Sequence, residues 1–408
     1  MRRCCTLGAF LIALLAAACA HGAAPTGPSV VPPNSVRTFA DGNASHGFHV
    51  VYDFNGSTGS KDGSHPSGAL LNAGGTLYGL TQNGGTNGQG TMYSLSLGGK
   101  ETVIHNFGAN GDGKVPSGAL IHVNGALYGD TQGSNNSTNC GSVFAADLAG
   151  HEKFVYLFRG KPNGCAPYGS PVQVGKELYG TTYDGGRNGM GSIFHLQTNG
   201  TGEKLDHSFP PGGTLPQTAL LDVKGDLFGT TSVGGTQDGG ALFKLVHGKV
   251  HTLHNFGGNS DGNTPVADLI DVKGTIYGTT HTGGSSGTGT VFAVTRGGKY
   301  KVIYSFGPPT LGDGNYPHGA LIDVGRTLYG TTEQGGAYGY GAIYSITRSG
   351  HEKVLYSFGK NLTHGSDGYD PQSSLIEANG TLYGTTNQGG IYNGTRSGCC
   401  GAVFAYKP

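Results

Sequence analysis

Seven variable residue pairs could contact a ligand, because each follows a copy of one recurring motif yet differs from copy to copy. The motif is Leu-Tyr-Gly-Thr-Thr or a close variant, as at residues 328–332. The variable positions carry amides, hydroxyls, an imidazole and carboxylates, which suit neutral, hydroxyl-rich ligands such as glycans better than phosphates. The competing interpretation is a solvated surface without a ligand. The predicted ligand-binding residues are Gln82, Asn83, Gln132, Tyr183, Asp184, His281, Glu333, Gln334, Asn387 and Gln388.

Acid–base catalysis has little support in the sequence. Glycoside hydrolysis needs two carboxyl groups about 5 to 9.5 Å apart. Asp130, Asp184 and Glu333 are single carboxylates that we expect near the variable pairs, isolated from one another along the chain. No G-x-S-x-G nucleophile motif and no paired His-Glu zinc motif occur. The sequence therefore predicts no catalytic residue and no cofactor.

Five Asp-Gly dipeptides could either bind calcium or form turns. Calcium takes six to eight oxygen ligands, whereas residues 259–263, for example, supply a single carboxylate. We therefore predict turns, capped by the aspartate side chain with the glycine at positive φ, and no metal site. The dipeptides begin at Asp62, Asp112, Asp261, Asp313 and Asp367.

The recurring motif also indicates the framework that positions these residues. It occurs seven times at spacings of 49 to 54 residues, and each unit adds D-G-x-x-P, A-L-I, G-G, G-x-V-F and L-Y-S-F segments or variants of them. Four short apolar segments separated by Gly, Asp, Asn and Pro are typical of strands. Four strands in every 40 to 50 residues are typical of a propeller blade. The sequence therefore predicts an all-β, seven-bladed β-propeller with four antiparallel strands per blade.

The two ends of the repeat region complement each other. Residues 49–54 resemble a fourth strand without a preceding unit, while residues 402–405 form a third strand without a following fourth. We therefore expect the N-terminal strand to complete the last blade, which removes two open sheet edges.

In such blades the turn between strands two and three lies on the same face as the turn that links one blade to the next. This places the variable pairs in a polar collar on one face. It also brings Cys140 near Cys165, so we expect a disulfide between them. Cys399 and Cys400 then either bond to each other or remain thiols.

The N-terminus is typical of an exported protein. Residues 1–20 have the basic, apolar and small-residue regions of a signal peptide. Two cleavage positions compete, after Ala20 or before Cys19, and the second would make Cys19 a lipid-bearing first residue. Residues 21–47 resemble a flexible tether, and residues 48–408 form the propeller. We expect a periplasmic, outer-membrane-anchored or extracellular location.

The balance of 25 basic and 25 acidic residues predicts no general attraction to nucleic acid. Membrane contact is expected only through a lipid at Cys19. The 79 glycines exclude long helices, and we expect a monomer.

The full pattern, L-Y-G-T-T-x-x-G-G with D-G-x-x-P before it and G-x-V-F after it, resembles the GloVer tandem repeat of choice-of-anchor bacterial proteins. The resemblance covers about residues 48–406. It implies an exported or cell-surface repeat protein and carries over no catalytic residue. We therefore predict a non-enzymatic scaffold or binding module for carbohydrate or protein, with a secreted carbohydrate-active hydrolase or lyase as the alternative.

Overall fold

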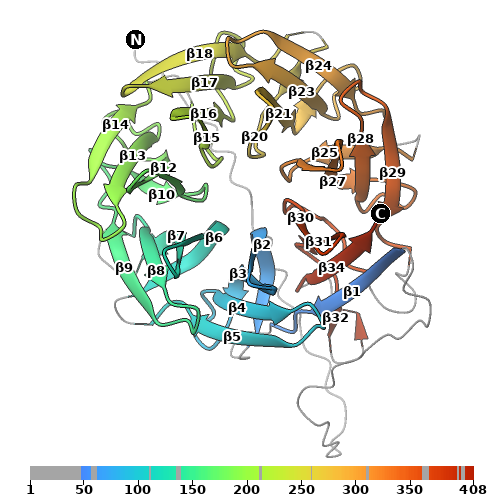
Figure 1. Cartoon of the computed structure of the whole chain (residues 1–408), viewed down its shortest axis with the longest axis horizontal. Coiled ribbons are helices and arrows are strands. Elements are labelled where there is room, and N and C mark those ends of the chain that lie inside the picture. Colours follow the sequence, from blue (N-terminus) through green and yellow to red (C-terminus); the bar gives the residue numbers. More distant parts are fainter. Residues whose placement is uncertain are drawn as a thin grey trace, which may run out of the picture. The chain divides into compact units, whose positions relative to one another are not determined.

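Seven antiparallel sheets surround a central axis in the computed structural model, which confirms the predicted seven-bladed β-propeller (Figure 1). The structure describes residues 47–56, 62–109, 112–134, 139–210, 214–258, 260–308, 312–360, 367–392, 395–396 and 400–408. All regular elements in these segments are strands. No helix among them is long and apolar enough to cross a membrane.

Each of the first four blades runs from an innermost to an outermost strand. Blade 1 contains β2 (Gly63–Ala73), β3 (Thr76–Gly84), β4 (Thr91–Ser96) and β5 (Glu101–Asn106). Blade 2 contains β6 (Gly113–Val123), β7 (Ala126–Ser134), β8 (Ser142–Ala146) and β9 (Glu152–Leu157). Blade 3 contains β10 (Cys165–Pro167), β11 (Val172–Val174), β12 (Glu177–Asp184), β13 (Ser192–Gln197) and β14 (Lys204–Ser208). Blade 4 contains β15 (Leu221–Val223), β16 (Asp226–Thr231), β17 (Ala241–Val246) and β18 (Lys249–Asn255).

The last three blades follow the same order, with two small additional ladders. Blade 5 contains β20 (Ile270–Val272), β21 (Thr275–Thr280), β23 (Thr290–Thr295) and β24 (Tyr300–Ser305), with β19 (Gly262–Asn263) paired to β22 (Thr282–Gly283). Blade 6 contains β25 (Gly314–Pro317), β26 (Ile322–Val324), β27 (Thr327–Gly335), β28 (Ala342–Ile346) and β29 (Glu352–Ser357). Blade 7 contains β30 (Ile376–Ala378), β31 (Thr381–Thr386), β34 (Ala402–Lys407) and β1 (Gly47–Asp53), with β32 (Ile391–Tyr392) paired to β33 (Thr395–Arg396).

One aromatic contact recurs at every seam, by which we mean the contact between the outer parts of neighbouring blades. A buried ring on the third strand of one blade meets a Phe that follows the outer strand of the preceding blade, with ring centroids 4.9 to 5.6 Å apart. Burying each such ring contributes about 1.5–3 kcal/mol, so the seams hold the ring of blades together. The pairs are Phe54–Tyr93, Phe107–Phe144, Phe158–Phe194, Phe209–Phe243, Phe256–Phe292, Phe306–Tyr344 and Phe358–Phe404.

The glycine of the Leu-Tyr-Gly-Thr-Thr motif makes room for that ring. In blade 1, Gly79 lies directly opposite Tyr93 on the neighbouring strand. A Cβ atom on Gly79 would overlap the Tyr93 ring, and the equivalent glycine of each other blade is in the same position. Glycine within a strand is therefore required here by close approach.

The N-terminal strand closes the ring as predicted. β1 pairs antiparallel with β34, from Gly47 opposite Lys407 to Asp53 opposite Ala402. Phe48 of β1 stacks on Tyr356 of blade 6, with centroids 3.8 Å apart. Phe54 then makes the seam contact with blade 1, so this one segment joins three blades (Figure 1).

The Asp-Gly dipeptides cap the blade-linking turns, but their glycines serve a purpose that we did not predict. Asp313 Oδ2 accepts hydrogen bonds from Tyr304 OH (2.7 Å) and Gly307 N (2.6 Å). The predicted positive φ is wrong for Gly314, where a Cβ atom would instead collide with the Thr332 side chain. The prediction is also wrong at Gly63, Gly113 and Gly262, and holds only at Gly368.

A disulfide joins Cys140 to Cys165, as predicted, and ties the second-to-third-strand turn of blade 2 to the turn that links it to blade 3. Cys400 is also disulfide-bonded. Its predicted partner Cys399 lies outside the described residues, as do Cys19, the signal peptide 1–20 and all of the tether 21–47 except Gly47.

Removal of the closing strand is expected to expose β34 and both neighbouring seams. Deleting residues 46–55 should leave a protein that elutes as soluble aggregates and lacks a cooperative thermal transition.

Phe54→Ala tests the seam contact alone. It should lower the free energy of unfolding by about 3–5 kcal/mol, because Phe54 is fully buried.

Size-exclusion chromatography and thermal unfolding measure both effects, with a deletion of residues 1–45 as the control. Closure would be contradicted if the deletion of 46–55 unfolded as cooperatively as the control and at the same temperature.

Candidate functional site

A polar hollow lies where the innermost strands of all seven blades converge. It is shallow: its cavity volume is about 100 Å³, and the rest of the hollow is open to solvent. Hydroxyl and amide side chains dominate its lining. The polar side chains around it are Gln82, Ser67, Ser117, Tyr168, Ser170, Gln217, Asp268, His318, Gln372, Ser373, Ser374 and Asn387.

Only part of the predicted collar lines this hollow. Gln82 and Asn387, each the first residue of its variable pair, contribute directly to the lining. The hollow therefore extends toward the face of the second-to-third-strand turns and the blade-linking turns, and we call it the link-face hollow. Tyr183 is also a first residue, and its ring centroid is 6.3 Å from that of Tyr168, which does line the hollow. Gln132, the first residue of the variable pair in blade 2, is half-buried.

The second residue of each pair has a different environment, because successive side chains of a strand point to opposite sides. Asn83 lies 3.4 Å from His65, measured between Nδ2 and Nδ1. Asp184 is exposed, is paired with Cys165 across the ladder, and accepts a hydrogen bond from Gly185 N (2.6 Å). Gln334 is exposed. Strand alternation therefore divides the predicted collar into two rows.

Titratable side chains concentrate between blades 5 and 7, in what we call the His281 cluster: His281, Tyr316, His318, Glu333 and Asp370. His281 Nε2 lies 3.4 Å from Glu333 Oε2. The His281 ring centroid is 5.2 Å from Tyr316 and 6.0 Å from His318. Two members, His281 and Glu333, belong to the predicted set.

Two glutamine side chains donate hydrogen bonds to Asp370, a carboxylate of this cluster. Gln388 Nε2 donates to Asp370 Oδ2 (3.3 Å), and Gln372 Nε2 donates to Asp370 Oδ1 (3.4 Å). Gln388 was predicted from the sequence, whereas Asp370 was missed because it belongs to the blade-linking segment and not to a variable pair.

Burial makes the His281 cluster weakly charged at neutral pH. Desolvation lowers the pKa of His281 to about 4 and also lowers the pKa of His318, so both imidazoles are neutral. Desolvation and the Asp370 carboxylate raise the pKa of Glu333 to about 7, and desolvation raises the pKa of Asp370 to about 6. The cluster therefore offers hydrogen-bond donors and acceptors without a stable positive charge for an anion.

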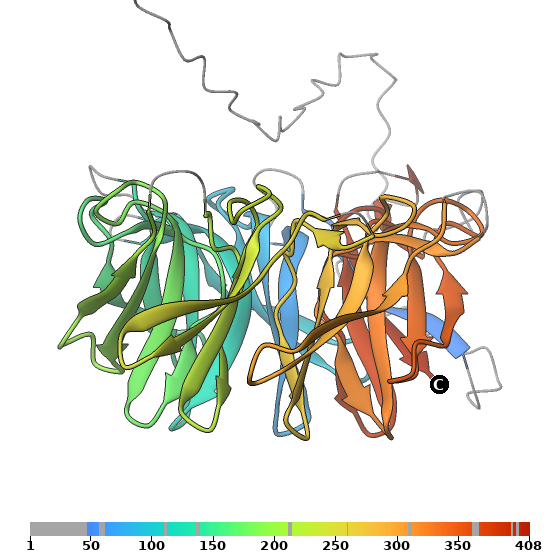
Figure 2. The same ribbon diagram turned by 90° about the horizontal axis from the view of Figure 1, so that it is seen from above.

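Three tyrosines lie in turns on the link face, the face with the blade-linking turns (upper side of Figure 2): two in the turn between β27 and β28, and one in the turn that links blades 6 and 7. We call Tyr338, Tyr340 and Tyr369 the tyrosine stripe. Tyr338 and Tyr340 are 45% and 39% exposed, high values for such large side chains. The Tyr340 and Tyr369 rings meet edge to face at 5.6 Å, and Asp370 N donates to Tyr340 O. The sequence signal for the stripe was the presence of two tyrosines in a turn that is otherwise rich in glycine.

Asp130 does not belong to the site. It replaces the first threonine of the motif in blade 2 and is completely buried, and neither carboxyl oxygen has a hydrogen-bond partner. Burial raises its pKa well above the ordinary value. Our placement of Asp130 near the collar was therefore wrong. Asp130, Asp184 and Glu333 lie in blades 2, 3 and 6, so the fold does not bring these three carboxyl groups together.

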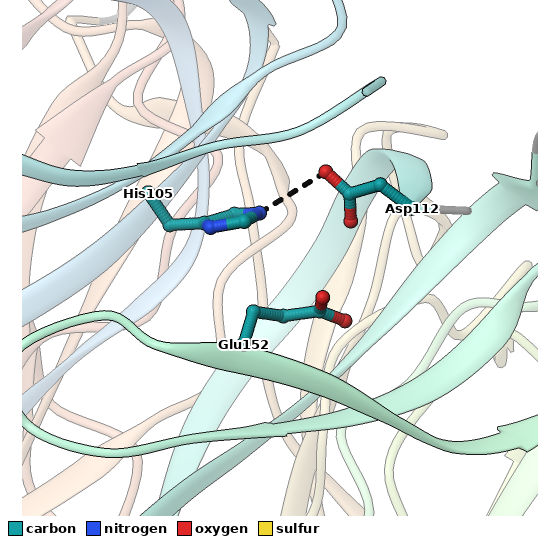
Figure 3. A group of neighbouring side chains, drawn as sticks. All are labelled: His105, Asp112 and Glu152. Carbon is teal, nitrogen blue, oxygen red and sulfur yellow. Dashed lines mark hydrogen bonds and ion pairs between the residues drawn. The ribbon is translucent and has the colours of Figure 1, made fainter. Parts of the chain in front are cut away.

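A separate group at the seam between blades 1 and 2 could hold a metal ion. His105, Asp112 and Glu152 place one ligand atom each within 4.8 Å of one another (Figure 3). We predicted no metal site and did not find this group from the sequence, since its residues come from two repeat units and a linking turn and form no local motif.

The fold and the link-face hollow define a seven-bladed β-propeller with a polar site at its axis. Within that class, the chain belongs to the family of the Gloeobacter/Verrucomicrobia repeat, which matches residues 38–194 and 166–404. The resemblance seen in the sequence is thereby confirmed. No curated protein matches the chain.

Solved structures similar to this chain share its fold at low sequence identity. A streptogramin B lyase is 14% identical with a TM-score of 0.57, covering 88% of this chain and 97% of the lyase. Virginiamycin B lyase from Staphylococcus aureus is 13% identical with a TM-score of 0.57, covering 87% of this chain and 99% of that protein. The GH74 enzyme of Niastella koreensis is 14% identical with a TM-score of 0.56, covering 81% of this chain and 52% of the enzyme. These likenesses show the fold alone.

Replacing Asp130 with the threonine of the repeat is expected to stabilise the protein. Asp130→Thr should raise the free energy of unfolding by about 1–3 kcal/mol at neutral pH, because it removes an unpartnered buried carboxyl group. The folded-state pKa of Asp130 lies above the unfolded value of about 3.9, so the wild type loses stability as the pH rises above about 4. The benefit of Asp130→Thr should therefore be small near pH 4 and larger near pH 7.

Denaturant unfolding at the two pH values measures this difference. Thr331→Asp, at the same position in blade 6, is the reverse control and should destabilise, because Thr331 donates to Ser373 O (3.0 Å). Equal stability of Asp130→Thr and wild type at pH 7 would contradict the assignment.

Proposed function

We propose that this chain is an exported, non-enzymatic binding module that holds a carbohydrate at the link-face hollow and the tyrosine stripe. The observation that carries the proposal is a hollow lined mainly by hydroxyl and amide groups, together with exposed tyrosine rings in a turn on the same face of the propeller. The disulfide and the membership of a bacterial repeat family are consistent with export.

The chemistry of the site matches a neutral sugar in two ways. Amides such as Gln82, Gln217 and Asn387 can both donate to and accept from hydroxyl groups. Tyrosine rings present apolar faces with a polar tip, which suits the mixed apolar and hydroxylated surface of a sugar. Neutral imidazoles at His281 and His318 and nearby carboxyl groups disfavour phosphorylated ligands.

Enzymatic turnover at the same site is the alternative, and one observation favours it. Glu333 has a pKa near 7, contacts His281 and is coupled to Asp370, as a general acid in a carbohydrate-active hydrolase or lyase would require. Some structural neighbours are lyases and one is a GH74 enzyme. Their identity to this chain, 13 to 14%, is too low to transfer an activity.

The binding proposal predicts that tyrosine-stripe variants lose affinity for a glycan. We expect a glycan array to identify at least one neutral ligand, and Tyr340→Ala to weaken its binding at least tenfold by calorimetry, equal to about 1.4 kcal/mol. Leu148→Ala is the matched control, since Leu148 is similarly exposed (42%) but lies in a hairpin on the opposite face. Absence of any glycan ligand, or equal effects of the two variants, would contradict the proposal.

A hydrolysis and elimination screen on the same ligands separates binding from turnover. The binding proposal predicts no product release by wild type or by Glu333→Gln. Product release by wild type that Glu333→Gln abolishes would instead establish the enzymatic alternative.

A further inference from the structure

The seam between blades 1 and 2 brings together three metal-ligating side chains from separate segments. His105 comes from β5, Asp112 from the turn that links the blades, and Glu152 from the start of β9 (Figure 3). His105 Nε2 lies 3.1 Å from Asp112 Oδ2. The His105 and Asp112 side chains are 20% and 7% exposed, so most of the site is shielded from solvent.

The two carboxyl groups have too few positive partners. Among the described residues, no lysine or arginine forms an ion pair with Asp112 or Glu152, and the one ion-pair partner is His105. The Oε1 atom of Glu152 is buried without a hydrogen-bond partner, as is that of Glu101 and Glu352 at the corresponding seams. Buried carboxylates are normally paired or coordinate a metal, and this unpartnered oxygen lies beside an imidazole nitrogen and a second carboxylate.

The equivalent positions at other seams can be compared with these three metal-ligating residues. At the seam between blades 5 and 6, Tyr304 takes the place of His105 and donates its phenol proton to Asp313 (2.7 Å), with Glu352 nearby. The seam between blades 7 and 1 has Tyr52, Asp62 and Glu101 in the same arrangement. The three seams therefore share an aspartate and a glutamate in the same arrangement, but a neutral phenol is a much poorer metal ligand than an imidazole.

A second histidine seam lacks the glutamate. His254 Nε2 lies 2.8 Å from Asp261 Oδ2, but Tyr300 stacks on His254 at the position of Glu152, Glu352 and Glu101 in the three seams described above. Among the described residues, the complete histidine, aspartate and glutamate set therefore occurs at the seam of His105.

We propose that His105, Asp112 and Glu152 bind one divalent transition-metal ion of the zinc type. One imidazole nitrogen and two carboxylate oxygens are ordinary zinc ligands, and water completes the tetrahedral shell. Ligand atoms about 2.1 Å from zinc lie about 3.4 Å apart, so side-chain rotations suffice to reach this geometry from the present separations. The ion joins blade 1 to blade 2 and is independent of the proposed carbohydrate site.

The test measures zinc binding to the full, untagged chain after treatment with EDTA. Calorimetry and elemental analysis with zinc chloride should give one tightly bound ion for wild type, and zinc should raise the Tm because only the folded chain holds the site. His105→Tyr recreates the tyrosine seam of blades 5 and 6, so it should fold with the EDTA-treated wild-type Tm and lose at least 100-fold in zinc affinity.

The reverse substitution, from tyrosine to histidine at another seam, is expected to create a second zinc site. Tyr304→His completes the ligand set with Asp313 and Glu352 and should raise the stoichiometry to two ions. The proposal is overturned if wild type holds no zinc at micromolar concentration, if His105→Tyr binds zinc as well as wild type, or if a folded Tyr304→His protein gains no ion.

Discussion

The contact between one aromatic ring and the next across each seam is the interaction on which the rest of the structure depends. Each ring occupies the space left by a glycine on the neighbouring strand and meets a phenylalanine from the preceding blade. Because the contact repeats in all seven blades, every blade has the same relation to its neighbours, and the ring closes when Phe54 meets Tyr93. The hollow at the axis is a consequence of this closure, since it brings the seven innermost strands together.

Function is expected where the blades differ. The seam contacts require the same residue types in every unit, whereas the link face carries different side chains in each blade. Blades 5 to 7 contribute the His281 cluster and the tyrosine stripe, while blade 2 carries a disulfide at the same face. The seam of His105 is also a departure from the repeat, because a single change from tyrosine to histidine alters what the carboxylates beside it can bind.

Sequence periodicity was sufficient for the fold because propeller contacts are local in the repeat. The blade number, the strand order, the closing role of β1 and the Cys140–Cys165 disulfide all follow from the positions of residues within a unit. The site was only partly predictable. Gln82, His281 and Glu333 were found from their variability, but Asp370 and Tyr340 lie outside the variable pairs.

Two errors and one omission have a physical explanation in the packing. The Asp-Gly glycines were assigned to positive φ, whereas Gly314 is required by the approach of Thr332, a contact between strands that a local motif does not show. Asp130 was placed near the collar, yet it occupies a core position that is threonine in blades 3 to 7. The His105 set was missed because its members are joined only when two blades pack together.

Hydrogen–deuterium exchange with a bound glycan is the most direct test of the link face as the binding surface. Protection is expected in the segments 67–70, 337–341 and 387–388, which line the hollow or carry the tyrosine stripe. Protection confined to opposite-face hairpins, such as residues 147–151, would contradict a ligand site at the link face.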